Sequence, residues 1–175
     1  MDRCPVRKLL LLTAVMAMAQ SPTYQIGRPA TPEEIRHWDI SIRPDGKGLP
    51  PGSGTVTAGK EIYANRCARC HGAEGQGSEG FPLVGGVGTL SGPKPLKTVA
   101  SYWPYAPTIF DYVRRAMPFD NPGTLSEDQV YSVTGYVLYL GGVVPAGAVI
   151  DAHSLPNVRM PNRNGFVPDP RPDTK

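Results

Sequence analysis

Cys67-Ala68-Arg69-Cys70-His71 is the stretch of sequence that decides the fold of this chain. Two cysteines three positions apart, followed at once by a histidine, form the C-x-x-C-H pattern of covalent c-type haem attachment. Each thiol adds to one vinyl group on the same edge of the porphyrin, so the two cysteines must lie about one helical turn apart. The histidine then falls under the iron and supplies its proximal nitrogen ligand. The pattern therefore predicts one covalent haem c held by Cys67, Cys70 and His71.

Two other kinds of site use a C-x-x-C pair, namely redox-active disulfides and zinc sites. A zinc site needs two further Cys or His ligands, and the only other cysteine, Cys4, lies outside the body of the chain. A thioredoxin-like pair would open a helix after a strand, whereas this pattern closes a predicted helix. The sequence therefore favours haem attachment over both alternatives.

Glycine and proline are unusually frequent, since 20 of each make up 40 of the 175 residues. A chain of this length is enough for one domain with tails. Gly and Pro concentrate outside the region around the C-x-x-C-H pattern, and such a composition favours irregular structure. We therefore expect a compact centre, residues 55–142, between extended arms.

Residues 1–19 predict a secretory signal peptide. Three basic residues precede an apolar run from Leu9 to Met18, and Ala17-Met18-Ala19 is a small-x-small cleavage site. The run is too short to span a bilayer comfortably, and an uncleaved anchor is the alternative. Cleavage would leave 15 basic and 14 acidic residues, a net charge of +1. That balance argues against a nucleic-acid-binding surface.

Residues 20–54 are predicted to form an extended N-terminal arm. Thr31 and Pro32 are a cap and a first helical residue for one short helix, and residues 43–54 are rich in turn formers. The arm also carries five apolar residues, Ile26, Ile35, Trp38, Ile40 and Ile42. A solvated linker would not need them, so the arm packs either on a partner or back on its own domain. His37 is an alternative iron ligand only in a bis-His haem.

The compact centre is predicted to hold three helices. The first covers 57–70, with Thr57 as its N-cap and with Gly59 and Tyr63 on one face. The second covers 106–116 and the third 126–140, whose Ser126 and Gln129 make a capping box. We expect the third helix to cross the first near Gly59 and Tyr63, because glycine permits close approach of two helix backbones.

Met117 is the candidate sixth ligand of the haem iron. It ends the second predicted helix, and a Met/His ligand pair raises the reduction potential. A core methionine is the alternative interpretation. The chain after residue 19 has only one other methionine, Met160, which lies in a proline-rich arm covering 143–175. Prolines forbid long helices there, so that arm is a poor platform for a buried ligand; residues 168–175 could also form a disordered end.

Two further groups of residues are candidate haem contacts. The carbonyl of Pro82, in the apolar loop 81–86, is predicted to accept a hydrogen bond from the other ring nitrogen of His71. Tyr102, Trp103 and Tyr105 could donate to haem propionates while their rings shield the porphyrin. Ordinary loop packing and core packing are the alternatives.

Residues 57–142 resemble the class I c-type cytochromes. The resemblance rests on the C-x-x-C-H pattern followed by Gly72, on the Met117-Pro118 pair after a helix, and on a serine-capped C-terminal helix. It implies a small all-α domain in which the terminal helices cross and haem forms much of the core. It also implies export, because members of this family receive their haem outside the cytoplasm.

A closer resemblance covers most of the chain beyond residue 19 and points to the cytochrome subunit of sulfane and sulfite dehydrogenases. It is carried by Ile26 to Ile35, Trp38 to Ile40, Arg43 to Gly46, Leu49 to Gly54, Ser101 to Ala106, Arg115 to Phe119 and Arg159 to Asn162. It implies a periplasmic, non-catalytic electron-transfer subunit with no membrane span after signal cleavage. The implied partners are a molybdenum-cofactor dehydrogenase subunit, around which the arms wrap, and a downstream periplasmic electron acceptor.

Two other functions remain open from the sequence. A free-standing electron-carrier cytochrome would not copurify with a larger enzyme. A haem enzyme acting on thiosulfate or peroxide would need an open iron position and a polar distal pocket. No distal acid–base histidine is evident, and a closed His71–Met117 pair would leave no open position.

Overall fold

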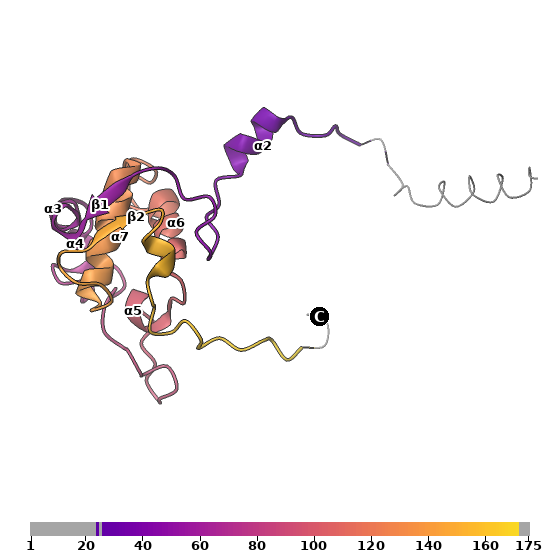
Figure 1. Cartoon of the computed structure of the whole chain (residues 1–175). Coiled ribbons are helices and arrows are strands. Elements are labelled where there is room, and N and C mark those ends of the chain that lie inside the picture. Colours follow the sequence, from indigo (N-terminus) through magenta and orange to yellow (C-terminus); the bar gives the residue numbers. More distant parts are fainter. Residues whose placement is uncertain (1–23, 25, 172–175) are drawn as a thin grey trace, which may run out of the picture. The chain divides into compact units, whose positions relative to one another are not determined.

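The computed structural model describes residue 24 and residues 26–171 (Figure 1). The predicted signal peptide and residues 172–175 lie outside the described residues. The chain divides into two compact units, the first ending at Asp39 and the second beginning at Ile40. Each unit is described by itself.

The first unit contains the predicted short helix, α2 (Pro32–Trp38). The hydroxyl of Thr31 accepts from the Glu34 amide, and the Glu34 carboxylate accepts from the Thr31 amide, which makes a reciprocal capping box. Glu34 also forms an ion pair of 2.6 Å with Arg28. The guanidinium of Arg28 lowers the pKa of the Glu34 carboxyl to about 2. These contacts explain how a seven-residue helix with no buried side chain is held.

The second unit is mostly helical, in agreement with the predicted all-α class. Its helices are α3 (Val56–Arg66), α4 (Ala68–His71), α5 (Val99–Tyr102), α6 (Ala106–Ala116), α7 (Glu127–Leu140) and the 3-10 helix η1 (Leu155–Asn157). Two short strands, β1 (Ser53–Thr55) and β2 (Val149–Asp151), pair antiparallel. No helix in the described part of the chain is both long and apolar enough to cross a membrane.

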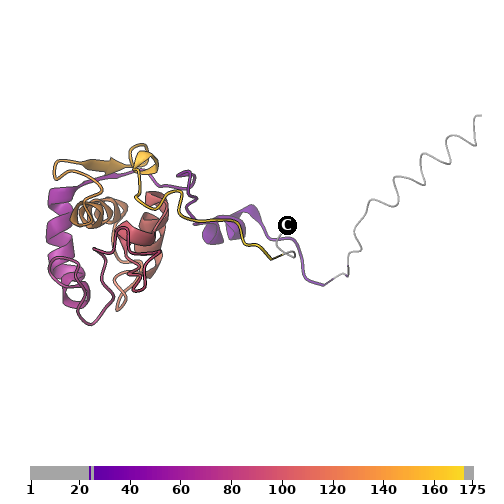
Figure 2. The ribbon, with the colours of Figure 1, turned by 90° about the horizontal axis from the view of Figure 1, so that it is seen from below.

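Helix α7 is the centre of the core. Figure 2 shows it nearly end-on, with α3 on one side and α6 on the other. The predicted crossing with α3 is confirmed, because a β-carbon at Gly59 would lie 2.6 Å from the carbonyl carbon of Ser132. The rings of Tyr63 and Tyr136 meet one turn further along, with centroids 5.2 Å apart. The glycine thus lets the two backbones touch.

Two predicted helices are confirmed, and the first needs a correction. The 106–116 helix and the helix capped by Ser126 have the predicted ends. The N-cap of the first helix lies two residues earlier than predicted, because Thr55 and not Thr57 caps it by accepting from the Ala58 amide. It also does not run unbroken to residue 70. Cys67 leaves helical geometry, with φ −124° and ψ −37°, and α4 begins after it.

Residues 40–54 do not form a separate arm but fold back on the second unit. The Ile42 amide donates to the buried carboxylate of Asp111, and the hydroxyl of Tyr131 donates to the Pro50 carbonyl at 2.8 Å. Near the strand, the Ser53 amide donates to Asp128. The first part of the predicted N-terminal arm, up to Asp39, belongs to the other unit.

The first part of the C-terminal arm also belongs to the core. Strand β2 pairs with β1, so that Ser53 lies opposite Asp151. Leu155 is fully buried, and Met160 is only 3% exposed. The proline-rich segment thus buries a methionine in the core, whereas its predicted unsuitability as a platform for an iron ligand stays a prediction. Prolines prevent long helices, but they do not prevent irregular chain from packing on α6 and α7.

Candidate functional site

The two cysteines and the histidine of the C-x-x-C-H pattern lie on one turn of chain. The amides of Cys70 and His71 both donate to the Cys67 carbonyl, at 3.1 and 3.0 Å. All three residues are half-buried, so their reactive atoms border the core without being enclosed by it. The spacing of about one helical turn that the sequence predicts is therefore present.

A hydrogen bond from a neighbouring loop fixes the His71 ring. Its Nδ1 lies 2.8 Å from the Phe81 carbonyl oxygen. Because a carbonyl can only accept, Nδ1 carries the proton and Nε2 keeps a free lone pair for a metal. The acceptor is one residue earlier than the predicted Pro82. Bonds from the Gly80 amide to the Cys70 carbonyl (2.7 Å) and from the Leu83 amide to the Gly75 carbonyl (2.7 Å) set the loop in this register.

Tyr63 supports the turn after the histidine, a role that the sequence analysis did not assign. Its buried hydroxyl donates to the Gly72 carbonyl at 2.8 Å. Burial raises the pKa of Tyr63 to about 12, so the hydroxyl stays protonated as a donor. Gly72 has φ +79°, a conformation that other residues rarely adopt. Tyr63 lies one turn before Cys67 on the side of α3 that faces α7. That position in the sequence could have indicated its role in supporting the turn.

The electrostatics of the cysteines distinguish the alternatives. Burial raises the pKa of the Cys67 thiol to about 11. Redox-active cysteines have lowered pKa values, because the thiolate is the reactive form. A structural zinc site needs four ligands, and no group of three or more His, Cys, Asp or Glu side chains gathers within the described residues.

Met117 lies at the end of α6, where it is the C-cap residue and is partly buried. Its amide donates to the Val113 carbonyl at 3.1 Å, which ties its backbone to the last turn of the helix. Met160, in contrast, is part of the hydrophobic core cluster. The half-exposed methionine is thus the one at the helix end, and the buried methionine is the one in the C-terminal segment.

Two arginines near the cysteines contact the loop that follows Met117. Arg66 Nη2 donates to Thr124 Oγ1 at 3.1 Å. Arg69 Nη2 lies 3.4 Å from Asp120 Oδ2. The C-x-x-C-H turn and the segment after Met117 are therefore neighbours, although they are far apart in the sequence.

The three aromatic candidates are half-buried and contact other side chains. Tyr102 meets the ring of Phe166 at 5.3 Å, and Trp103 meets Tyr112 at 5.8 Å between ring centroids. The guanidinium of Arg163 lies over the ring of Tyr105, 5.2 Å from its centroid. These contacts are those expected if the three rings pack against other side chains. Hydrogen bonds from their polar groups to haem propionates stay a prediction.

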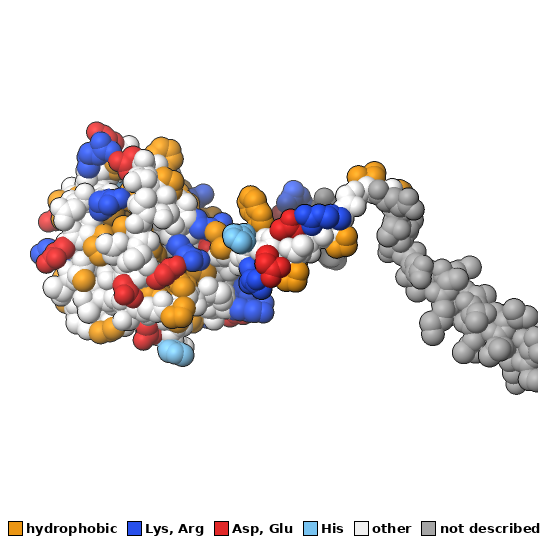
Figure 3. Space-filling model, turned by 90° about the horizontal axis from the view of Figure 1, so that it is seen from above, with side chains coloured by type: hydrophobic (Ala, Val, Ile, Leu, Met, Phe, Trp, Pro, Cys, Tyr) orange, Lys and Arg blue, Asp and Glu red, His pale blue; other side chains and the backbone are white. Residues whose placement is uncertain are grey.

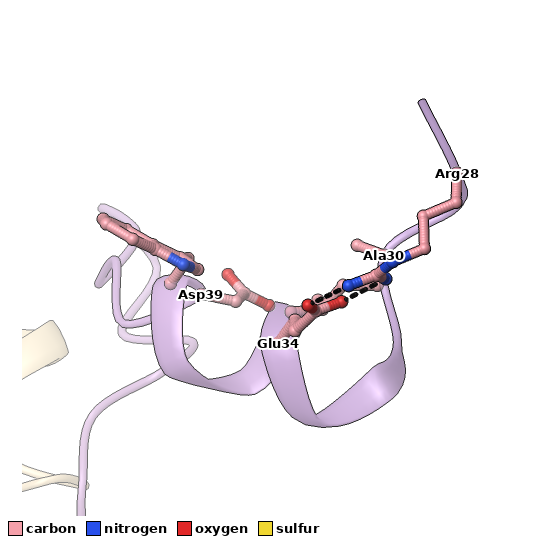
Figure 4. Close-up of a pocket in the computed structure, with 6 residues that line it drawn as sticks. Arg28, Ala30, Glu34 and Asp39 are labelled. Carbon is pink, nitrogen blue, oxygen red and sulfur yellow. Dashed lines mark hydrogen bonds and ion pairs between the residues drawn. The ribbon is translucent and has the colours of Figure 1, made fainter. Parts of the chain in front are cut away.

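The first unit carries a surface pocket of its own (Figure 4). Arg28, Ala30, Glu34 and Asp39 line it together with Ile35 and Trp38, and Arg28 and Glu34 are joined by two hydrogen bonds. Trp38 is 85% exposed. His37 lies on the same helix, with its Nδ1 2.8 Å from the Glu33 carbonyl oxygen.

Charged side chains of both signs are interspersed over the face of the second unit that Figure 3 shows. Such a mixed surface gives no extended basic stripe of the kind that tracks a phosphate backbone.

The donor set as a whole fits a covalently attached haem. Two thiols lie on one turn, and an imidazole offers a free Nε2. A partly buried thioether ends a helix whose following loop contacts the same turn. Soft sulfur and imidazole nitrogen are the axial ligands of electron-transfer haem proteins.

Comparison with known sequences gives a family match and several relatives. The sequence profile of the family described as "Cytochrome c" matches residues 56–141. A thiosulfate dehydrogenase from Stutzerimonas stutzeri (strain A1501) is 29% identical over 96 residues, which cover 50% of this chain and 28% of the relative. The cbb3-type cytochrome c oxidase subunit CcoP from Azospirillum sp. (strain B510) is 34% identical over 99 residues, or 50% of this chain and 31% of the subunit. The chain thus matches less than a third of the length of these curated relatives.

A solved structure matches over much more of the chain. It is a chain in the crystal structure of the sulfane dehydrogenase SoxCD from Paracoccus pantotrophus, with a TM-score of 0.79 and 45% sequence identity. The match covers 87% of this chain and 76% of that chain. The structural match therefore includes residues outside 56–141, the range that the family profile covers.

Proposed function

This chain belongs to the cytochrome c family, and from that premise we propose that it is an exported electron-transfer subunit of a sulfur-oxidising dehydrogenase. One observation carries the proposal. The likeness to the SoxCD chain takes in 87% of this chain, about 152 of its 175 residues, whereas the family profile takes in 86. A free-standing carrier needs only the haem domain, so the shared flanking segments favour a subunit.

We assign the chain's own residues to one haem c. Cys67 and Cys70 supply the thioether sulfurs, and His71 supplies Nε2 while the Phe81 carbonyl holds Nδ1–H. Met117 is the proposed sixth ligand. Bound haem supplies a one-electron couple between ferric and ferrous iron, whose potential a Met/His pair raises. The chain contributes no acid, base or nucleophile to this function, so its part is to position the group and to shield it from water.

The polar tips of Tyr102, Trp103 and Tyr105 remain the proposed donors to the haem carboxylates. Their rings already pack against neighbouring side chains, which fixes where the tips lie. Ring contacts of this kind reduce the conformational entropy that a hydrogen bond would otherwise cost.

The proposed donor of electrons is a molybdenum-cofactor dehydrogenase subunit, which forms a hetero-oligomer with this chain. The proposed acceptor is a further carrier in the periplasm, to which the predicted signal peptide would direct the chain. Within the first unit, Tyr24, Ile26 and Trp38 are all at least 80% exposed. Trp38 lies on α2, whose reciprocal cap already orders it, so little further order has to be gained when this side chain docks on a partner. Tyr24 and Ile26 precede that helix.

The experiment that tests the proposal is a pull-down of the haem-loaded protein from its own periplasm, with metal analysis of the eluate. We expect molybdenum and a larger protein to copurify. A matched variant that lacks residues 24–39 keeps the whole second unit, and we expect it to bind the larger protein at least about tenfold more weakly. Iron alone in the wild-type eluate at low salt would contradict the subunit and favour a free-standing carrier.

A haem enzyme acting on thiosulfate or peroxide is the second alternative, and the thiosulfate dehydrogenase relative is the observation that favours it. Imidazole or cyanide binding to the ferric protein separates the two. A Met117-ligated iron resists these ligands, whereas an enzyme with an open position binds them readily.

A further inference from the structure

We propose that Arg66 and Arg69 latch the loop of residues 118–124 and so act as positioning residues for Met117. The inference rests on the proposed function, in which Met117 is the sixth iron ligand. It concerns a second question, namely what keeps that methionine in place once it is bound.

The latch consists of two contacts between distant parts of the sequence. Arg66 ends α3 directly before Cys67, and its Nη2 donates to Thr124 Oγ1, 58 positions later, at 3.1 Å. Arg69 lies between the two cysteines, and its Nη2 lies 3.4 Å from Asp120 Oδ2, 51 positions later. Both contacts therefore connect the turn that holds the haem to the segment that follows its proposed sixth ligand.

The loop itself transmits these contacts toward Met117. Thr124 Oγ1 donates to the Asn121 carbonyl at 2.8 Å. The Asn121 amide donates in turn to the Pro118 carbonyl at 3.0 Å, and Pro118 is the residue after Met117. Thr124 is thus connected to the residue after Met117 by two hydrogen bonds, and Asp120 lies three positions after Met117 in the same loop.

Met117 is held from its other side by α6. Its amide donates to the Val113 carbonyl at 3.1 Å, which is the last hydrogen bond of that helix. On the C-terminal side, Pro118 is buried and Ser126 caps α7, so the loop is anchored at both ends. Residues 119–124 between these anchors are exposed, and the latch ties them to the C-x-x-C-H turn. Without the latch, we expect this exposed segment to move more and to hold the Met117 thioether less firmly.

The latch is weak and should respond to salt. The side chains of Arg69 and Asp120 are 72% and 68% exposed. Loss of an exposed ion pair should change the equilibrium constant between the closed and the open loop by about 1.5- to 5-fold. Salt screens such pairs. The loop is therefore held closed in dilute buffer and opens more often at high ionic strength.

Imidazole binding to the ferric, haem-loaded full-length protein measures how often Met117 leaves its position. The variants are Arg69→Gln, Asp120→Asn, the two combined, and Arg66→Gln. The matched control is Arg43→Gln, which removes a pair of 2.9 Å with Asp45 on side chains that are 62% and 56% exposed. Each protein is titrated at low and at high salt, and the absorption band of methionine-ligated ferric haem is recorded in parallel.

We expect each latch variant to bind imidazole about 1.5- to 5-fold more tightly than wild type at low salt. The combined Arg69→Gln, Asp120→Asn protein should resemble either single variant, because both remove the same contact. High salt should bring wild type toward the variants, and the control should behave as wild type throughout. Unchanged imidazole binding in all latch variants, with the methionine band lost in Met117→Ala, would overturn the latch alone. A methionine band that survives in Met117→Ala would overturn both the ligand assignment and the latch.

Discussion

The backbone of Gly59 lies against the backbone of Ser132 where α3 crosses α7. A β-carbon at Gly59 would lie 2.6 Å from the Ser132 carbonyl carbon and 2.8 Å from Cβ of Tyr136. Main-chain atoms cannot rotate away as a flexible side chain can. The packing of the two helices that frame the core therefore depends on the absence of a single carbon atom.

Gly59→Ala should destabilise the haem-loaded protein by about 1–3 kcal/mol, because the added methyl forces the helices apart. Urea unfolding followed by circular dichroism measures the loss. Gly147→Ala is the matched control, since nothing lies within 4 Å of the added carbon there. The control should be neutral or slightly stabilising. Equal stabilities of the two variants would show that the crossing tolerates a side chain.

Met117→Ala should change the haem spectrum and the reduction potential, whereas Met160→Ala should change the stability. Met117→Ala should abolish the absorption band of methionine-ligated haem and lower the reduction potential, because the soft axial ligand is lost. Met160→Ala should keep the band but cost about 2–5 kcal/mol of unfolding free energy, because Met160 is buried in the core. Spectra, redox titration and urea unfolding of both variants test this pair. Loss of the band in Met160→Ala would instead identify Met160 as the ligand.

Tyr131 should link stability to alkaline pH. Its hydroxyl donates to the Pro50 carbonyl, and burial raises its pKa to about 12 from an ordinary value of 10. The stabilisation is therefore complete below pH 10 and is lost as the pH rises through 12. Tyr131→Phe should cost about 1 kcal/mol at neutral pH and reduce this alkaline loss. The exposed Tyr139, changed to Phe, is the control, and unfolding is followed as a function of pH.

Asp111 should anchor the start of the second unit. Its carboxylate accepts from the Ile42 amide at 3.2 Å and pairs with Arg115. Asp111→Ala should speed hydrogen exchange at the Ile42 amide and lower stability by about 1–3 kcal/mol, since a buried donor loses its acceptor. Asp111→Asn keeps an acceptor oxygen and removes only the charge, so it should protect Ile42 better than Ala does. Identical exchange in both variants would assign the anchoring to the charge pair.

Glu34 should titrate well below an ordinary glutamate. The guanidinium of Arg28 lowers its pKa from 4.5 to about 2. Its contribution to α2 is therefore complete above pH 4.5 and is lost as the pH falls through 2. Carboxylate chemical shifts measured by NMR against pH give the value directly. Arg28→Gln should move the pKa back toward 4.5, and an unchanged value would mean that the Thr31 cap alone holds it.

Features encoded by neighbouring residues could be predicted from the sequence. Ser126 and Gln129 define the start of α7 because a capping box needs only four residues. Pro107 and Pro118 bracket α6 because proline acts on its own and the preceding residue. The C-x-x-C-H turn is equally local, which is why the haem site was visible before the fold.

Features decided by distant residues could not be predicted in the same way. Thr55 and Thr57 are equally good caps by type, and the pairing of β1 with β2 is what sets Thr55 in the extended conformation of a cap. The Phe81 carbonyl replaces that of Pro82 because loop hydrogen bonds set the register. Met160 is buried in a core cluster that also holds Ile109, Phe110 and Leu138, which precede it by 22 to 51 positions.

The pairing of β1 with β2 also determines the order in which the domain can be completed. Ser53 meets Asp151, 98 positions later, so this contact carries one of the largest loop-closure costs in the chain. A chain that emerges N-terminus first presents β1 and the two cysteines long before β2 exists. Cys67 and Cys70 therefore precede the segment that closes the domain by about 80 positions. The small sheet is therefore among the last contacts of the second unit that a chain growing from its N-terminus can make.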